Sequence, residues 1–168
     1  MNSDELIRED VMNGDEDTVS NKYLTFHLGK EDYGIEIKNV TEIVVVQKIT
    51  QVPDMPEYVQ GVINLRGQVI PVMDIRLRFN MEFREYDERT CVIVVSLNDI
   101  HVGLIVDTVQ EVCEILPENV SPAPRLGTSE KNRYIMGMGK IGDNVKILLN
   151  VDLLIQDDEL AMLEEAAS

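Results

Sequence analysis

Alternating apolar and polar residues dominate the first third of the chain and predict β-strands. Leu24, Phe26 and Leu28 are separated by single polar residues, which is the period of a strand with one buried face. A second alternating run follows at 33–37, close enough to the first to form a hairpin. Residues 44–46 predict a third strand. The pattern places the chain in the all-β class.

The segment Gly61–Asp74 predicts a second hairpin. Arg66-Gly67-Gln68 separates two apolar runs, and this glycine can adopt the positive φ that a tight turn needs. Pro71 has no amide hydrogen to donate to a neighbouring strand, so it suggests an edge strand or a bulge. Asp74 is expected to cap a short helix over residues 75–79.

Short strands and turns continue through the rest of the chain. Further strands are predicted at 91–97, 102–106, 109–112, 134–136 and 145–149, with a glycine-rich turn between the last two and loops at 80–89 and 114–133. Other short helical segments are expected: one turn at 57–60 after Pro56, a helix capped by Asp152, and an amphipathic helix near the C-terminus.

An internal repeat divides the chain into two similar halves. The equivalent residues are Gly34 and Gly103, Val40 and Val109, Glu42 and Glu111, Tyr58 and Tyr134, and the triplets Val72-Met-Asp74 and Asn150-Val-Asp152. The first three pairs share one offset, 69 residues. The repeat predicts two intertwined five-stranded β-barrels, roughly 22–90 and 91–156, which share an apolar interface because each is very small. Residues 1–21 are expected to form an acidic flexible tail, and 157–168 a C-terminal helix or tail.

Charge and composition exclude several classes of protein. The formal net charge of −16 is concentrated in the ends, since residues 22–156 hold 14 basic and 19 acidic residues. A folded part with this excess of acidic residues is expected to bind nucleic acid poorly, because binding phosphates requires clustered Lys and Arg. The longest apolar run is far too short to span a membrane, and the N-terminus lacks the pattern of a signal peptide. Cys91 and Cys113 are therefore expected to be reduced in a cytoplasmic protein.

No motif in the sequence predicts catalysis, a cofactor or a metal site. Gly137–Gly142 fits G-x-G-x-x-G, but a β-pattern rather than a helix follows, so a hairpin turn explains it better than phosphate binding. His27 and His101 have no Cys or His at metal-binding spacing. No Ser, Cys or Lys lies in a recognisable nucleophile motif. The chain is expected not to be an enzyme.

Glu42 and Arg66 are the unusual charged residues, because both interrupt apolar sequence. A structural interpretation is a mutual ion pair, since charges in apolar surroundings are usually paired. A functional interpretation is that the pair lies at a docking surface and fixes its shape. The second half keeps Glu111 but has no equivalent arginine, so the two halves are not interchangeable.

Five segments together resemble the CheW family of bacterial chemotaxis coupling proteins. They are Tyr-Gly-Ile-Glu-Ile at 33–37, Val-Thr-Glu-Ile at 40–43, Tyr-Val-Gln-Gly-Val-Ile-Asn-Leu-Arg-Gly at 58–67, Val-Ile-Pro-Val-Met-Asp at 69–74 and Val-Gly-Leu-Ile-Val-Asp at 102–107. The resemblance extends from about Lys22 to the C-terminus. It implies two SH3-like five-stranded barrels, no enzymatic activity and no cofactor.

The resemblance also implies partners and contact residues. A CheW-like protein would couple the cytoplasmic tip of chemoreceptors to the histidine kinase CheA, so that receptor state controls autophosphorylation at membrane-associated arrays. The implied receptor contacts are Val40, Glu42, Arg66, Cys91, Val92, Val109 and Val112. The implied contacts with the CheA regulatory domain are Glu57, Tyr58 and Gly61. Two alternatives stay open: the regulatory domain of a CheA-type kinase, and a protein that binds a small ligand between the barrels.

Overall fold

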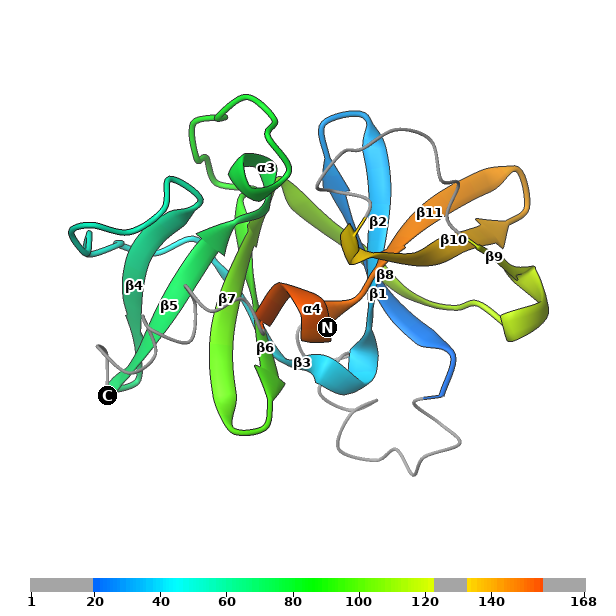
Figure 1. Ribbon diagram of the computed structural model, residues 1–168, viewed down its shortest axis with the longest axis horizontal. Coiled ribbons are helices and arrows are strands. Elements are labelled where there is room, and N and C mark those ends of the chain that lie inside the picture. The colour runs from blue at the N-terminus through cyan, green and yellow to red at the C-terminus, as the bar shows by residue number, and fades with distance from the viewer. Residues whose placement is uncertain (1–19, 123–132, 156–168) are drawn as a thin grey trace.

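A computed structural model describes residues 20–122 and 133–155, which form two β-sheets packed side by side (Figure 1). Sheet A has six strands in the order β8-β1-β2-β11-β10-β9, and sheet B has five in the order β3-β6-β7-β5-β4. The strands of sheet A are β1 (Lys22–Leu28), β2 (Glu31–Glu36), β8 (Thr108–Glu114), β9 (Val120–Ser121), β10 (Ile135–Ile141) and β11 (Asn144–Leu149). Those of sheet B are β3 (Val40–Val45), β4 (Val59–Leu65), β5 (Gln68–Asp74), β6 (Cys91–Leu97) and β7 (Ile100–Val106). The predicted all-β class is confirmed.

Each sheet takes strands from both sequence repeats. Strand β3 leaves the first repeat and pairs with β6, while β8 leaves the second repeat and pairs with β1. The chain crosses between sheets twice, at the 3-10 turn η1 (Ile37–Asn39) and at Asp107. The ranges 22–90 and 91–156 therefore mark the repeat in the sequence and do not correspond to the two sheets.

The repeat is preserved in the strand register. Val72 pairs with Gly103 in a parallel ladder of sheet B, and Leu148 pairs with Gly34 in the corresponding ladder of sheet A. Both glycines lie against leucine or valine side chains, with no room for a Cβ: that of Gly103 would lie 2.6 Å from Val92 Cγ1. Close approach of strands explains why glycine recurs at this position.

Main-chain hydrogen bonds correct one detail of the predicted repeat. The Asp74 amide donates to the Tyr58 carbonyl over 2.7 Å, and the Asn150 amide donates to the Tyr134 carbonyl over the same distance. Asp74 therefore corresponds to Asn150 and not to Asp152. The sequence alignment followed the repeated Val-x-Asp letters, whereas the hydrogen bonds keep one constant spacing from each tyrosine.

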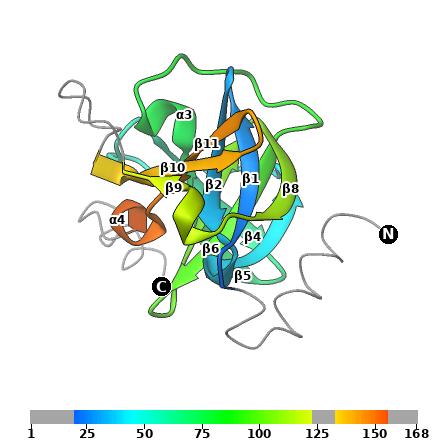
Figure 2. The ribbon, with the colours of Figure 1, turned by 90° about the vertical axis from the view of Figure 1, so that its right-hand side faces the viewer.

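The largest apolar core lies between the two sheets. It combines Leu24, Phe26 and Ile35 from sheet A with Ile93 and Leu104 from sheet B, all fully buried. Helix α4 (Val151–Ile155) contributes to the same core and lies between the sheets in Figure 1. Figure 2 shows α4 and α3 (Ile75–Arg78) on the same side of the strands. An apolar interface was predicted between the two halves of the sequence, whereas the core lies between two sheets that each combine strands of both halves.

Arg78 provides a polar connection within this interface. Its guanidinium lies 4.5 Å from the centre of the Tyr58 ring and 4.8 Å from that of Tyr134, and it donates to the Tyr134 hydroxyl. Arg78 follows sheet B in α3, whereas Tyr134 leads into sheet A. The burial of a cation here is compensated by two aromatic faces and a hydrogen bond.

Two predicted local structures are wrong. Residues 57–60 do not form a helical turn: they make a hydrogen-bonded turn, with the Val59 amide 3.0 Å from the Pro56 carbonyl, and β4 begins at Val59. Residues 137–141 belong to β10 rather than to a glycine-rich turn, which is confined to the end of that hairpin. In both cases a β-bulge after the tyrosine shifts the register, which strand periodicity alone does not show.

Pro71 lies in an internal strand and not at a sheet edge. Strand β5 has β4 on one side and β7 on the other. Pro71 is opposite Val62 in β4, and the ladder with β7 begins only at Val72. The missing amide hydrogen is tolerated because the second neighbour joins one residue later.

The caps of the two helices are equivalent. Asp74 accepts a hydrogen bond from the Leu77 amide at 3.3 Å, as predicted. In α4 the capping oxygen belongs to Asn150, which accepts from the Leu153 amide at 3.2 Å, so the prediction that Asp152 is the cap is wrong. The predicted tail at 1–21, apart from its last two residues, and the predicted C-terminal helix lie outside the described residues.

Candidate functional site

The predicted ion pair between Glu42 and Arg66 is confirmed. Arg66 lies in the β4–β5 turn with φ of 51°, followed by Gly67 at 87°, and the Gly67 amide donates to Asn64 Oδ1 over 2.8 Å. The turn presents the guanidinium to Glu42 on β3, where Nη1 donates to Oε1 at 2.7 Å and Nη2 binds Oε2. This two-point geometry is specific to arginine and raises the pKa of Arg66.

The pair is presented on the surface. The Arg66 side chain is 69% exposed and the Glu42 side chain 11% exposed. Solvent weakens such a pair, so its contribution to stability is small. An exposed guanidinium that Glu42 holds through two nitrogens is suited to contact another molecule.

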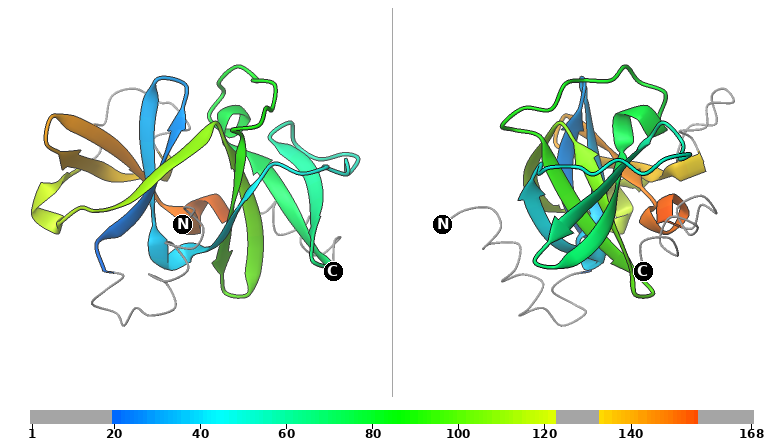
Figure 3. Two further views of the ribbon diagram at one scale, coloured as in Figure 1. Left: turned by 180° about the vertical axis from the view of Figure 1, so that it is seen from behind. Right: turned by 90° about the vertical axis from the view of Figure 1, so that its left-hand side faces the viewer.

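Three predicted receptor-contact residues are half-buried apolar side chains on β6 and β8. Cys91, Val109 and Val112 are all partly exposed and pack against the core between the sheets. Val45, which is 60% exposed and pairs with Cys91, is a further exposed apolar side chain and was not predicted. We call these four residues the seam. Figure 3 shows β3 and β8, which carry most of the seam, on one face of the molecule.

Val40 and Val92 are placed differently from the prediction. Their exposed fractions are 2% and 0%. Val40 belongs to the core between the sheets, and Val92 to the core within sheet B. Their expected role therefore changes from contacts with a receptor to supports for β3 and β6. Sequence alone could not separate them from Val109 and Val112, because all four are valines in similar strands.

The three predicted kinase contacts also differ in their accessibility. Glu57 is exposed, and Tyr58 is half-buried against Arg78. Gly61 is buried, and a Cβ on it would lie 2.1 Å from the Thr50 carbonyl oxygen. Residues 50 and 62 exchange two main-chain hydrogen bonds across this point, at 2.8 and 2.9 Å. Gly61 is therefore needed for the chain to pass close to Thr50.

A second polar cluster, at the crossing from β7 to β8, was not predicted. Arg76 Nε and Nη2 donate to the two carboxylate oxygens of Asp107 at 2.7 and 2.6 Å, and the Gly29 amide donates to Oδ2 at 2.9 Å. Burial disfavours the charged carboxylate, but these bonds outweigh it and lower the pKa of Asp107. Nearby, burial raises the pKa of Asp74, whose carboxylate accepts from the Tyr86 hydroxyl at 2.6 Å.

The remaining candidate groups are accounted for by local contacts. His27 Nδ1 lies 2.5 Å from Asp32 Oδ1, and the nearly buried Lys146 amine lies 2.9 Å from the other oxygen. Neither Cys91 nor Cys113 is in a disulfide, and burial raises the pKa of Cys113. Within residues 20–122 and 133–155, no three His, Cys, Asp or Glu side chains could hold a metal ion. No helix in the same part of the chain is long and apolar enough to cross a membrane.

Two SH3-like β-domains that exchange strands, with an ion pair and partly exposed apolar side chains on their surface, place the protein in the all-β class. Residues 22–159 match the family model of the CheW-like domain. The chain belongs to the CheW-like family.

Similar proteins from several bacteria agree with this assignment. The chain is 35% identical to the chemotaxis protein CheW of Klebsiella aerogenes, covering 90% of this chain and 91% of the relative. It is 34% identical to CheW of Helicobacter pylori, covering 82% of each. In structure it is similar to the scaffolding protein TtCheW of Thermoanaerobacter tengcongensis, with a TM-score of 0.75, 34% identity, and coverage of 83% of this chain and 94% of that one.

Proposed function

We propose that this protein couples the cytoplasmic tip of chemoreceptors to the histidine kinase CheA, without catalysing a reaction itself. The main supporting observation is the exposed two-point Glu42–Arg66 pair, together with the partly exposed apolar side chains of the seam. A helix docks by laying an apolar stripe against such side chains, while an oriented charge fixes its register. The tip of a receptor is a helical hairpin, so it fits this surface.

We assign the two partners to different surfaces. Glu42, Arg66 and the seam would contact the receptor. Glu57 and the exposed part of Tyr58 would contact the CheA regulatory domain. Binding to both partners would recruit the protein from the cytoplasm to receptor arrays. Separate surfaces are required for a bridge, because one surface could hold only one partner at a time.

A binding experiment tests the bridge. The purified protein is mixed with a receptor cytoplasmic fragment and a CheA regulatory domain, separately and together. A ternary complex is expected. Binding to the kinase alone would remove the support for the receptor site, and binding to neither would overturn the proposed function.

Arg66→Ala tests the receptor site directly. It is expected to weaken receptor binding by roughly tenfold or more, as for the loss of a well-placed arginine anchor, and to leave the circular dichroism spectrum unchanged. Lys140→Ala, an exposed cation in the hairpin of the other sheet, is the control. Unfolding of Arg66→Ala would instead mean that the pair is structural.

Val109→Lys should also block binding to the receptor and leave binding to the kinase intact. Val145→Lys is the control and should leave binding to both partners unchanged.

A further inference from the structure

The geometry points to Asp107 as a positioning residue: its carboxylate locks the angle between the two sheets and with it the shape of the seam. This inference rests on the proposed function only where it concerns receptor binding. Asp107 is the single residue between β7 in sheet B and β8 in sheet A. Two seam residues, Val109 and Val112, lie on β8 directly after it.

Contacts of this carboxylate come from both sheets. Gly29, which donates its amide at 2.9 Å, lies in the β1–β2 turn of sheet A. Arg76, which binds both oxygens, lies in α3 at the end of β5 in sheet B. Arg84, from the loop after α3, adds a contact at 3.5 Å. The Asp107 carboxylate thus connects its own crossing to two distant parts of the chain, the β1–β2 turn and the region 76–84.

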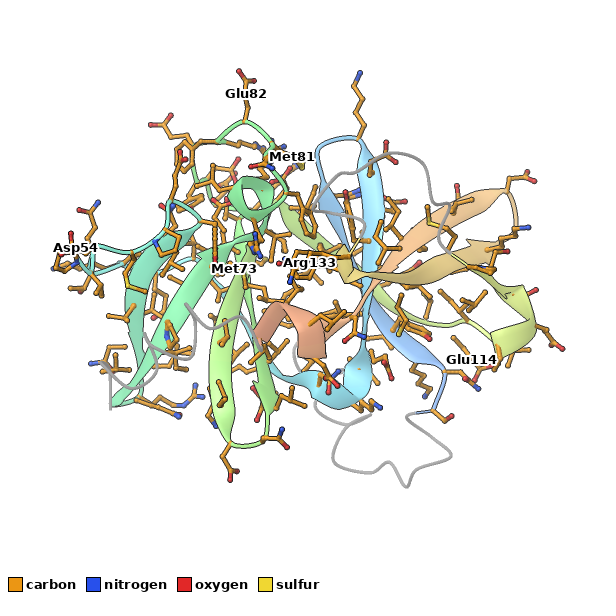
Figure 4. The ribbon with its side chains drawn as sticks, viewed as in Figure 1. Asp54, Met73, Met81, Glu82, Glu114 and Arg133 are labelled. Carbon is orange, nitrogen blue, oxygen red and sulfur yellow. The ribbon has the colours of Figure 1, made fainter. Side chains whose placement is uncertain are left out.

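The surroundings of Asp107 hold it in a fixed geometry. Its side chain is 10% exposed, and that of Arg76 is 16% exposed. The Asp107 amide also donates to the His27 carbonyl over 3.2 Å, which fixes the backbone at the crossing. Met81 contacts the position of Gly29, since a Cβ there would lie 3.2 Å from Met81 Cε. Figure 4 shows Met81 on the side of the loop nearest the β1–β2 turn.

The other crossing between the sheets has no such lock. Lys38 occupies the position of η1 that corresponds to Asp107 in the repeat. Its side chain is 62% exposed and reaches Glu36 at 3.3 Å, an ion pair in solvent. Buried, fully bonded networks restrict geometry far more than exposed pairs do. Of the two crossings, the one at Asp107 therefore restricts the angle between the sheets more strongly, and Lys38 provides a matched control.

The test measures the angle and the binding separately. Spin labels are attached at Val69→Cys and Val145→Cys, two exposed valines on opposite sheets, in the full chain with Cys91→Ala and Cys113→Ala. Asp107→Asn should broaden the distribution of label distances, whereas Lys38→Gln should leave it unchanged. In the unlabelled protein, Asp107→Asn should weaken receptor-fragment binding roughly three- to tenfold and leave CheA-domain binding unchanged. The effect is moderate because Asp107 would not touch the receptor itself and would act only by positioning the seam residues on β8.

A second variant guards against simple destabilisation. Asp107→Asn leaves the Arg76 charge without its partner, and this alone can loosen the fold. Arg76→Met/Asp107→Asn removes both charges, so its thermal stability should recover while the distance distribution stays broad. A narrow distribution in this double variant, or in Asp107→Asn, would overturn the lock. A broad distribution with unchanged receptor binding would overturn its link to docking. If the natural chain binds no receptor fragment, the proposed function fails. The distances between the spin labels then still test whether Asp107 fixes the angle between the sheets.

Discussion

The role of each side chain at the candidate site depends on how much space surrounds it, on a scale of a few ångströms. Arg66 is exposed because its turn projects it from the hairpin, and it is oriented because Glu42 holds two of its nitrogens. Val40 and Val92, in contrast, are enclosed by neighbouring strands. An exposed, oriented cation can recognise a partner, whereas an enclosed valine can only support the strand that carries the recognition residues.

Gly61 illustrates a strict requirement for a missing side chain. Gly61→Ala is expected to destabilise the protein by about 3 kcal/mol or more, because a Cβ would collide with the Thr50 carbonyl and the backbone has a positive φ. Gly67→Ala is the control: its φ is also positive, but no atom lies within 4 Å of the added Cβ. It should cost only about 1 kcal/mol. Chemical denaturation measures both, and equal losses would contradict the clash.

Helices and hairpins repeat across the two sheets with their local chemistry intact. Each β-hairpin after a tyrosine has a bulge, and each ends in a short helix whose capping residue also donates its amide to that tyrosine carbonyl. The capping residue differs, Asp74 in one helix and Asn150 in the other. Both side chains carry an oxygen at the right distance, so the repeat conserves a function of the side chain rather than its identity.

The cap of α4 can be tested with adjacent residues. Asn150→Ala should lower the free energy of unfolding by about 1 kcal/mol, because it removes the oxygen that accepts from the Leu153 amide. Asp152→Ala changes an exposed residue inside the helix and should stay within about 0.5 kcal/mol of the natural protein. A larger loss for Asp152→Ala than for Asn150→Ala would restore the cap predicted from the sequence.

Because the two sheets exchange strands, we expect the molecule to unfold as a single cooperative unit. Sheet A needs β8, β10 and β11 from the second repeat, and sheet B needs β3, β4 and β5 from the first. The largest core is built by both sheets together. A half-chain therefore has neither a complete sheet nor a partner surface, although its sequence resembles a small domain.

Half-chains test this arrangement. Fragments 1–89 and 90–168 are each expected to be unfolded alone, because each leaves several strands without neighbours. Mixed and refolded together, they should recover β-type circular dichroism and a cooperative unfolding transition. A two-state transition in either fragment alone would mean that the repeats fold independently.

The buried cluster at the crossing between the sheets should make stability depend on pH. The pKa of Asp107 is lower in the folded chain than the ordinary value of about 4. Its contribution is therefore complete above that value and is lost as pH falls through the lower, folded pKa. The difference in unfolding free energy between the natural protein and Asp107→Asn should be constant near pH 7 and shrink below about pH 4. A constant difference down to pH 2 would show that this carboxylate does not titrate as described.

The sequence by itself determined most of the strands, the hairpins and the repeat, and it offered the Glu42–Arg66 pair as one of two interpretations. These features depend on local alternation, turn residues such as Gly67, and the cost of an unpaired charge among apolar residues. The resemblance of a few segments was enough to indicate the family. The predicted strand at 91–97 agrees with β6 in its bounds, and the alternation of Leu24, Phe26 and Leu28 falls within β1.

Only the tertiary structure decided which strands share a sheet and which valines reach the surface. Periodicity shows that one face of a strand is buried but not which neighbour buries it, so the exchange of β3 and β8 could not be deduced. For the same reason Val40 and Val109, equivalent in the repeat, differ in exposure. The role of Asp107 was invisible because its partners, Gly29 and Arg76, are distant in the sequence. Contacts between distant residues arise from packing, which local patterns do not encode.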